Sequence, residues 1–412
     1  MIKRKISLSY VVLCIYLLLE ARFFYLIPKN SLYSGFNYKS KTVIALFCII
    51  AFVLFMCKEK KLILDKRLKW IWAMLLYIGF ESLRNVHRFD MSFYEIFSLG
   101  HGFLLLLLYP IIAINSDEES QKKIINVITV FSIILSTLFL TQSFAYKLLK
   151  ITFLHIKEYP SLALIQKRSY GIRMTVPGTL IIFSTLISFG QILGKKKGIH
   201  ILNCILGMLY IVLVCQTRMT TLAIIATFMI ILSNKIFENR FKYLKEIMVI
   251  IIAIFIFILP FRISEIFENN HSGSVYAREY AVKYYMESFL KHPLFGVGCL
   301  ENDTKNHDIL LIMHGSKGYA NTTDVGYIGY IFQYGIVGIV LLLFLLKNII
   351  NIIKKVKNKN EMYYSTITCL LYILLTCGTL SIFDTQRIVM LPIILYMLNC
   401  LEINENEKEF NN

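Results

Sequence analysis

The sequence predicts an all-α integral membrane protein, a polytopic bundle of about 12 transmembrane helices with one large loop on the outer side. Hydrophobic residues make up 57% of the 412 residues and charged residues 17%, whereas soluble domains carry roughly 25% charged residues. Apolar runs of about 20 residues, the length that a helix needs to cross a bilayer, recur along the chain. Because Leu, Ile and Phe fill these runs without alternating with polar residues, we expect helices rather than barrel strands.

The predicted spans are mostly apolar runs bounded by polar or basic residues, and together they form a single membrane domain over residues 1–412. The first run lacks the small-residue cleavage site of a signal peptide, so we interpret it as a retained span. An even number of spans puts both termini on the same side of the membrane. In chain order the twelve runs are residues 8–27, 42–57, 69–86, 93–114, 124–141, 176–193, 199–215, 219–233, 246–262, 325–346, 363–380 and 386–401.

The distribution of basic residues indicates which side this is. The formal net charge is +18, and Lys and Arg crowd into short loops on the side of the termini, as in Lys195-Lys196-Lys197 and Lys354-Lys355. Short loops rich in Lys and Arg stay in the cytoplasm, so both termini are predicted to be cytoplasmic. The same distribution favours contact with anionic membrane lipids over nucleic acid. None of the nine cysteines belongs to a CxxC pair, and we expect neither disulfides nor a zinc site.

Two connections on the predicted outer side are long, residues 142–175 and residues 263–324. Long connections in compact proteins are usually functional or disordered. The second carries aromatic residues at helical spacing from Tyr276 to Phe289, and His292-Pro293 is expected to end that helix. An aromatic helix beside a membrane most simply lies in the interface.

Arginines on the predicted outer side are the first candidates for a binding site, because positive charge there runs against the topological bias. Arg168, Arg173, Arg218 and Arg278 belong to this group. Arginine holds phosphate oxygens in a bidentate fork and stays charged. Arg218 lies between two apolar runs with little loop to solvate it, which favours a functional role; snorkelling to lipid headgroups is the alternative.

Two carboxylates stand at span ends on the same side. Asp324 lies where the large outer loop re-enters the membrane, ahead of a glycine-containing span that lets neighbouring helices approach closely. It could cap that helix, or it could act as a general base facing the arginines. Asp384 occupies a short outer turn with Arg387, and the two could form an ion pair.

Several of these stretches, taken together, resemble the O-antigen polymerase and ligase superfamily (Wzy- and WaaL-like proteins). They are residues 216–220 (QTRMT) opening a span, Arg278 ahead of residues 291–298 (KHPLFGVG), the re-entry over residues 324–338, and residues 168–173 (RSYGIR) followed by Pro177. The landmarks cover about residues 165–346. Each one is short, and their order and their placement on one side of the membrane make the resemblance specific.

The resemblance implies a GT-C-like membrane fold in the bacterial cytoplasmic membrane. It also implies a polysaccharide polymerase, which moves an oligosaccharide from undecaprenyl diphosphate to a growing acceptor glycan by an inverting, metal-independent reaction without a cofactor. The loops contain no Asp-x-Asp pair for a metal–nucleotide complex. A chain-length regulator protein is a further implied partner. The alternatives are a glycan ligase with the same donor, and a flippase for the lipid-linked oligosaccharide.

Site residues follow by position from the same resemblance. Arg218 and Arg278 match the arginines expected to hold the diphosphate, and Arg168 and Arg173 add to this group. Asp324 stands where the family often has a histidine, so either Asp324 replaces that histidine as the base, or His314 or His307 reaches in from the loop. The aromatic residues of 276–289 could stack on sugar rings, and we favour interfacial anchoring.

Overall fold

The structure, a computed structural model, describes most of the chain. The described residues are 8–27, 40–58, 65–91, 93–155, 165–168, 171–174, 178–194, 198–236, 272–300, 306–357, 359–384 and 386–411.

Helices make up nearly all of the described structure, in short and long pieces that follow the apolar runs. The longer helices are α1 (Leu8–Glu20), α3 (Ser40–Lys58), α4 (Lys66–Phe89), α5 (Phe93–Leu104), α6 (Leu108–Ala113), α7 (Glu118–Leu149), α8 (Thr179–Leu193), α9 (Ile199–Tyr210), α10 (Arg218–Ile236), α13 (Ser272–Lys291), α14 (His307–His314), α15 (Gly326–Lys355), α16 (Glu361–Thr376) and α17 (Leu391–Asn411). Short 3₁₀ turns are η1 (Arg22–Tyr25), η2 (Leu105–Leu107), η6 (Thr322–Asp324) and η7 (Ile388–Met390), and η4 (Ile211–Cys215) is a π-helix.

Every predicted span except one coincides with a described helix; residues 246–262 lie outside the described residues. Five described helices are long and apolar enough to cross a membrane: Lys41–Lys58, Glu118–Leu149, Arg218–Ile236, Gly326–Lys355 and Ile388–Asn406. Shorter apolar helices are Leu8–Glu20, Gly100–Ala113, Thr179–Leu193 and Ile199–Cys215. The protein is therefore a multi-pass helical protein, and the count of twelve spans stays a prediction.

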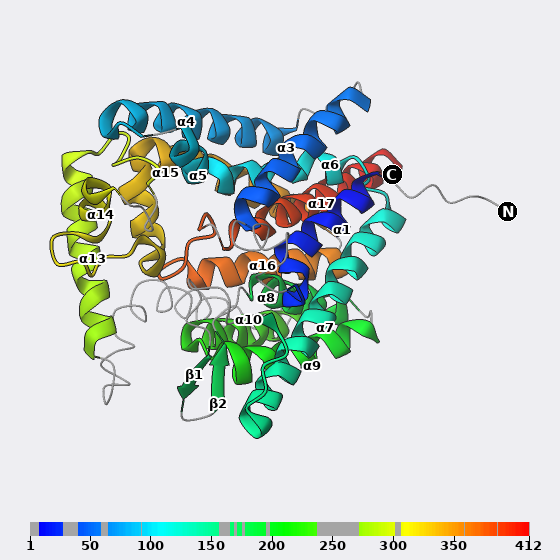
Figure 1. The fold of residues 1–412 in the computed structure, drawn as a ribbon. Coiled ribbons are helices and arrows are strands. Elements are labelled where there is room, and N and C mark those ends of the chain that lie inside the picture. The colour runs from blue at the N-terminus through cyan, green and yellow to red at the C-terminus, as the bar shows by residue number, and fades with distance from the viewer. Residues whose placement is uncertain are drawn as a thin grey trace.

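Helices α4, α16 and α17 run in roughly the same direction, α1, α3 and α7 run obliquely to them, and α13 lies across one end of the bundle (Figure 1). At this end, called the α13 end below, α4 finishes and α15 begins; the start of α1 and the end of α17 lie at the opposite end. The start of α1 and the end of α17 therefore lie at the same end of the bundle, and the even number of spans stays a prediction. Which side faces the cytoplasm stays a prediction.

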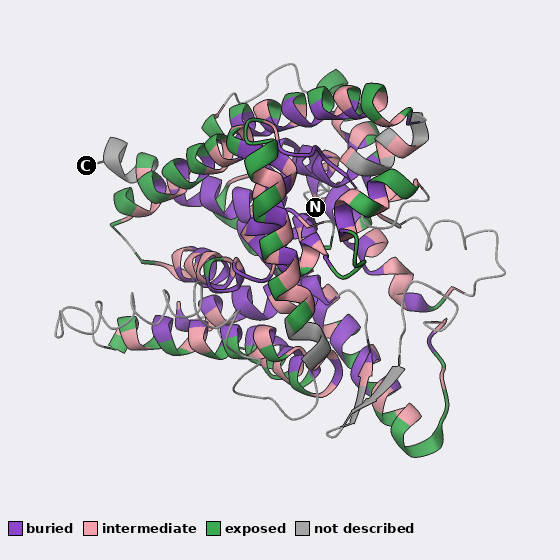
Figure 2. Ribbon diagram, turned by 90° about the vertical axis from the view of Figure 1, so that its left-hand side faces the viewer, coloured by how far each residue is buried: buried purple, intermediate pink, exposed green. Residues whose placement is uncertain are grey.

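Large apolar side chains fill the interior and also cover much of the outside. Trp70, Tyr16 and Tyr396 are fully buried in a continuous core, and Figure 2 shows buried positions inside the bundle and exposed positions along the outer faces of the helices. Leu76 and Met229 are among the many large apolar residues on these outer faces. Such faces are those of helices that contact lipid rather than water.

One hairpin departs from the expected all-α architecture. Strands β1 (Ile165–Arg168) and β2 (Gly171–Met174) form an antiparallel two-stranded sheet within the predicted outer segment 142–175. Its register pairs Gln166 with Arg173 and Arg168 with Gly171. Each strand has only four residues. An alternation of apolar and polar residues over four positions is too short to distinguish a strand in the sequence, so this hairpin was not predicted.

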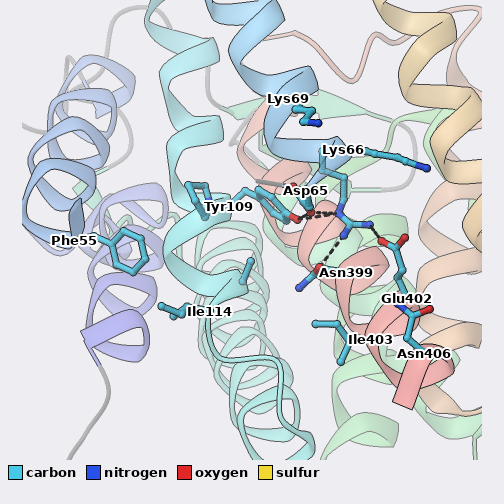
Figure 3. A pocket seen from close by; sticks show the side chains of 13 residues that line it. Phe55, Asp65, Lys66, Lys69, Tyr109, Ile114, Asn399, Glu402, Ile403 and Asn406 are labelled. Carbon is cyan, nitrogen blue, oxygen red and sulfur yellow. Dashed lines mark hydrogen bonds and ion pairs between the residues drawn. The ribbon is translucent and has the colours of Figure 1, made fainter. Parts of the chain in front are cut away.

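A cavity of about 410 Å³ lies between the start of α4, α6 and the later part of α17 (Figure 3). Arg67 is almost fully buried there and contacts Asp65, Tyr109, Asn399 and Glu402. Its guanidinium thereby joins the start of α4 to α6 and α17. We interpret this network as structural, since the candidate catalytic residues are at the other end.

Candidate active site

Arg278 lies on the inner face of α13. It shares that face with Ala281 and Tyr285, three and seven residues further on, and both of these are buried. The Tyr285 ring packs on Phe332 of α15 with centroids 4.3 Å apart. Arg278 itself is half-buried. The helix therefore presents Arg278 toward α14 and α15.

The tyrosine hydroxyls of α13 hold α14 in place. Tyr285 donates a hydrogen bond to the Met313 carbonyl at 2.6 Å, and Tyr284 donates to the Ile312 carbonyl at 3.1 Å. Burial raises the pKa of the Tyr285 hydroxyl, and the neighbouring Tyr284 and Asp324 raise it further. Tyr285 therefore stays a neutral donor. The interfacial position of α13 stays a prediction, and part of its aromatic face serves packing within the protein.

His314 is the last residue of α14, and its ring orientation is fixed. The Nδ1 atom lies 2.6 Å from the Ala320 carbonyl oxygen, and the Ala320 amide donates to the His314 carbonyl. A carbonyl only accepts, so Nδ1 donates the proton of this contact and Nε2 is the ring nitrogen left to act as a base. His307 starts the same helix, seven residues or about 10 Å away along the axis. Of the two histidines, His314 is the one joined to the segment that leads to Asp324.

Asp324 ends the short turn η6 at the mouth of α15, and its side chain is exposed. The turn η6 is itself capped by Asn321, whose side chain accepts from the Thr323 amide at 3.0 Å. The residue before α15, Val325, makes no side-chain cap. Within the described residues the Asp324 carboxylate accepts no capping hydrogen bond. Asp324 also lies near Tyr285, whose pKa its charge raises, so it stands beside the helix that carries Arg278.

The loop that follows α13 locks into a break in α15. The backbone of α15 leaves helical geometry at Gly335, with φ 57° and ψ −157°. Val297 and Gly298 donate to the carbonyls of Phe332 and Gln333, each at 3.0 Å. In return Ile336 and Val337 donate to the carbonyls of Pro293 and Leu294, at 2.9 and 3.1 Å. The two glycine-containing stretches noted in the sequence are thus one structural unit.

Helix α4 braces this unit from the side. Tyr77 donates to the Tyr334 carbonyl at 2.7 Å, Arg84 to the Gly296 carbonyl at 3.0 Å, and Asn85 to the Cys299 carbonyl at 3.0 Å. The sequence analysis did not single out these three residues. Their spacing of seven and eight residues on one helix face, in a span rich in polar residues, is the signal that could have found them.

Arg218 begins α10 immediately after a break between two helices. The π-helix η4 ends at Gln216, which adopts the left-handed conformation with φ 49°, and its side chain donates to the Leu213 carbonyl at 2.8 Å. The break leaves the Arg218 side chain exposed, and the expectation that little loop solvates it stays a prediction. An exposed guanidinium is open to a charged ligand and to lipid headgroups alike.

Arg173 comes close to the same break. Strand β2 packs against η4 and α7, and its residue Met174 is buried. The Nε atom of Arg173 is buried and has no hydrogen-bond partner among the described residues. The hairpin register places positions 168 and 173 on one face of the sheet. The hairpin thus brings an arginine to the element that precedes Arg218.

Helix α16 links this arginine group to the α13–α15 group. Tyr327 at the start of α15 donates to the Cys377 carbonyl at the end of α16, at 2.9 Å. Tyr372, five residues before Cys377 on α16, hydrogen-bonds Thr220 of α10. Thr220 lies two residues after Arg218. Both contacts fall within about 8 Å along α16. The starts of α10 and α15 therefore lie beside the same end of one helix.

The outer turn next to α16 adds a further guanidinium. Arg387 and Asp384 form the ion pair expected from the sequence, with Nη1 and Oδ2 2.8 Å apart, and both are mostly buried. Among the described residues, no three His, Cys, Asp or Glu side chains are grouped as metal ligands would be. The chemistry that these residues offer is anion binding by arginine, with a carboxylate and a histidine as possible proton acceptors.

The comparison with protein families agrees with the resemblance seen in the sequence. Residues 204–343 match the family model of O-antigen ligase. The match begins in α9 and ends in α15, and it contains Arg218, Arg278, His314 and Asp324. A search of curated proteins found no match. The apolar helices indicate a multi-pass membrane protein, and its residues 204–343 are similar to the O-antigen ligase family.

Proposed function

We propose that the protein is a polysaccharide polymerase that transfers an oligosaccharide repeat from undecaprenyl diphosphate to a growing glycan on the outer face of the cytoplasmic membrane. The observation that carries the proposal is the placement of Arg278, His314 and Asp324 on one α13–α15 assembly. Arg218 and Arg173 are tied to the same assembly through α16. This grouping falls largely within the stretch that matches O-antigen ligase.

The donor diphosphate is the proposed ligand of the arginines. A diphosphate is an activated leaving group, so the enzyme needs no nucleotide and no metal ion. Charge builds on the departing phosphate as the sugar–oxygen bond breaks, and fixed guanidinium groups stabilise that charge electrostatically. Arg218 and Arg278 are the proposed principal contacts, with Arg173 and Arg168 as additional ones.

The acceptor hydroxyl attacks the anomeric carbon from the side opposite the diphosphate. One bond forms between the hydroxyl oxygen and that carbon, the bond to the diphosphate oxygen breaks, and undecaprenyl diphosphate leaves. This single displacement inverts the anomeric configuration. Holding the two reactants in line accounts for much of the rate. The hydroxyl proton passes to Asp324 or to Nε2 of His314, and general base catalysis of this kind is worth about 10²–10⁴-fold.

The test is reconstitution of the purified protein with the purified lipid-linked repeat unit. We expect chain growth with the wild type and none with Arg218→Ala or Arg278→Ala. Lys283→Ala, on an exposed position of the same helix α13 as Arg278, is the matched control and is expected to retain chain growth. Full-length polymer from both arginine variants refutes the phosphate role.

The identity of the base is tested separately. Asp324→Asn preserves shape and removes charge, and a loss of about 10²-fold or more in turnover supports the carboxylate. Unchanged turnover transfers the role to His314, which His314→Gln then tests.

A glycan ligase is the second candidate, favoured by the description of the matching family. It uses the same donor and the same arginines but a different acceptor. In the reconstituted system, transfer to a lipid or protein acceptor without chain growth supports the ligase. Movement of the donor across the membrane without a new bond supports a flippase and contradicts both enzymes.

A further inference from the structure

A second group of cationic side chains lies where α4 and α13 end, apart from the proposed diphosphate contacts. Arg84 and Arg88 are one turn apart on α4, Lys291 is the last residue of α13, and His292 follows it. The pKa of His292 is lowered by partial burial and by the positive charges of Arg88, Arg84 and Lys291. His292 therefore lies near all three cations and favours its neutral form, and partial burial and Arg84 also lower the pKa of Arg88.

Among the residues that the structure describes, one ion pair balances this group. Arg84 pairs with the buried Glu81 at 2.8 Å. Within the described parts of the chain, Arg88 and Lys291 form no ion pair, and Asp90 at the end of α4 does not neutralise Arg88. Both unbalanced side chains are exposed. Positive charge that no described carboxylate compensates, on the predicted outer side of a membrane protein, is uncommon and favours an anionic ligand.

An exposed apolar stripe leads up to these charges along α4. Leu76, Phe80 and Leu83 are 73%, 49% and 72% exposed, and their spacing of four and three residues puts them on one face of the helix. Leu290 and Leu294 flank the same end of α13 and are also exposed. Phe80 packs on Phe295 with ring centroids 5.3 Å apart, so the stripe is continuous with the loop after α13.

We propose that this surface binds an anionic phospholipid of the surrounding leaflet, with its phosphate held by Arg84, Arg88, Lys291 and His292 and its acyl chains along the α4 stripe. The apolar stripe is followed along α4 by the cluster of cations, just as the acyl chains of a phospholipid are followed by its phosphate. The bound phosphate offsets the repulsion within the cluster. Arg84 also donates to the Gly296 carbonyl, so the lipid stabilises the loop that locks into α15.

This inference is independent of the proposed transferase, and its test measures lipid binding alone. The full-length protein is placed in phosphatidylcholine nanodiscs, and phosphatidylglycerol is titrated in while bound lipid is counted by native mass spectrometry. The test variant is Arg88→Gln/Lys291→Gln, which leaves Arg84 and its loop contact intact. The matched control is Lys122→Gln/Lys123→Gln, which also removes two exposed positive charges, both paired with glutamates on α7.

We expect the wild type and the control to prefer phosphatidylglycerol over phosphatidylcholine. The test variant should bind phosphatidylglycerol about 30-fold more weakly, because each cation near a lipid surface contributes about 1 kcal/mol. Equal affinity of wild type and test variant for phosphatidylglycerol overturns the proposal. A test variant that loses affinity only for added polyprenyl diphosphate also overturns it and assigns the cluster to the donor.

Discussion

Replacing Gly335 with alanine should undo the junction between the loop after α13 and the break in α15. A Cβ atom at this position would lie 2.5 Å from the Gly296 amide nitrogen and 2.6 Å from the Leu294 carbonyl oxygen. Both are backbone atoms, so no side-chain rotation relieves the overlap. The backbone at Gly335 also adopts a conformation that is open almost only to glycine.

The expected cost follows from the contacts at the junction. A residue other than glycine in such a conformation costs about 1–3 kcal/mol. Four backbone hydrogen bonds join residues 293–298 to residues 332–337, and each contributes about 0.5–1.5 kcal/mol. Loss of two of these bonds together with the strain gives a destabilisation of about 2–6 kcal/mol.

Thermal unfolding of the purified protein in detergent measures the loss of stability. The rate of protease cleavage within the loop after α13 measures how far that loop separates from α15. Gly79→Ala is the matched control, because a Cβ atom there meets nothing within 4 Å and alanine favours the helix. We expect Gly335→Ala to unfold at a lower temperature and to be cleaved faster. Equal stability of the two variants would refute the proposed junction.

Three further predictions concern other contacts. Tyr285→Phe leaves the Met313 carbonyl without its donor and should speed hydrogen exchange in α14 about tenfold; unchanged exchange contradicts the role of this hydroxyl. Arg67→Lys cannot satisfy the four partners of the buried guanidinium and should lower stability by about 3 kcal/mol in denaturant unfolding, whereas wild-type stability argues against the network. His292 has a lowered pKa, so its neutral form favours the folded state: its contribution is full above about pH 6.5 and is lost as the pH falls below that value. His292→Gln should therefore reduce the loss of thermal stability between pH 7.5 and 5.5, and an identical pH profile would exclude this contribution.

Apolar runs long enough to cross a bilayer predicted the positions of the helices well, because a helix in lipid must satisfy its own backbone hydrogen bonds. The turn at His292-Pro293 and the pair Asp384–Arg387 are also as expected. These features depend on residues close together in the sequence.

The features that the sequence analysis missed depend on contacts between distant segments. Several glycines lie between residues 326 and 338, and nothing local indicates that Gly335 is the one that breaks α15. The loop at 293–298 selects it by pairing with the backbone around it. The exposure of Arg218 likewise depends on the π-helix before it, which apolar periodicity cannot distinguish from an α-helix.

The proposed transfer on the outer face is tested most directly by finding which side of the membrane the α13 end faces. A membrane-impermeant maleimide is applied to intact cells that produce Asp324→Cys, and labelling is compared with that of the native Cys57, which is exposed near the end of α3. We predict that residue 324 is labelled in intact cells and that Cys57 is labelled only after the membrane is permeabilised. Labelling of Cys57 in intact cells, with residue 324 protected until permeabilisation, would place the arginines on the cytoplasmic side and contradict the proposed transfer.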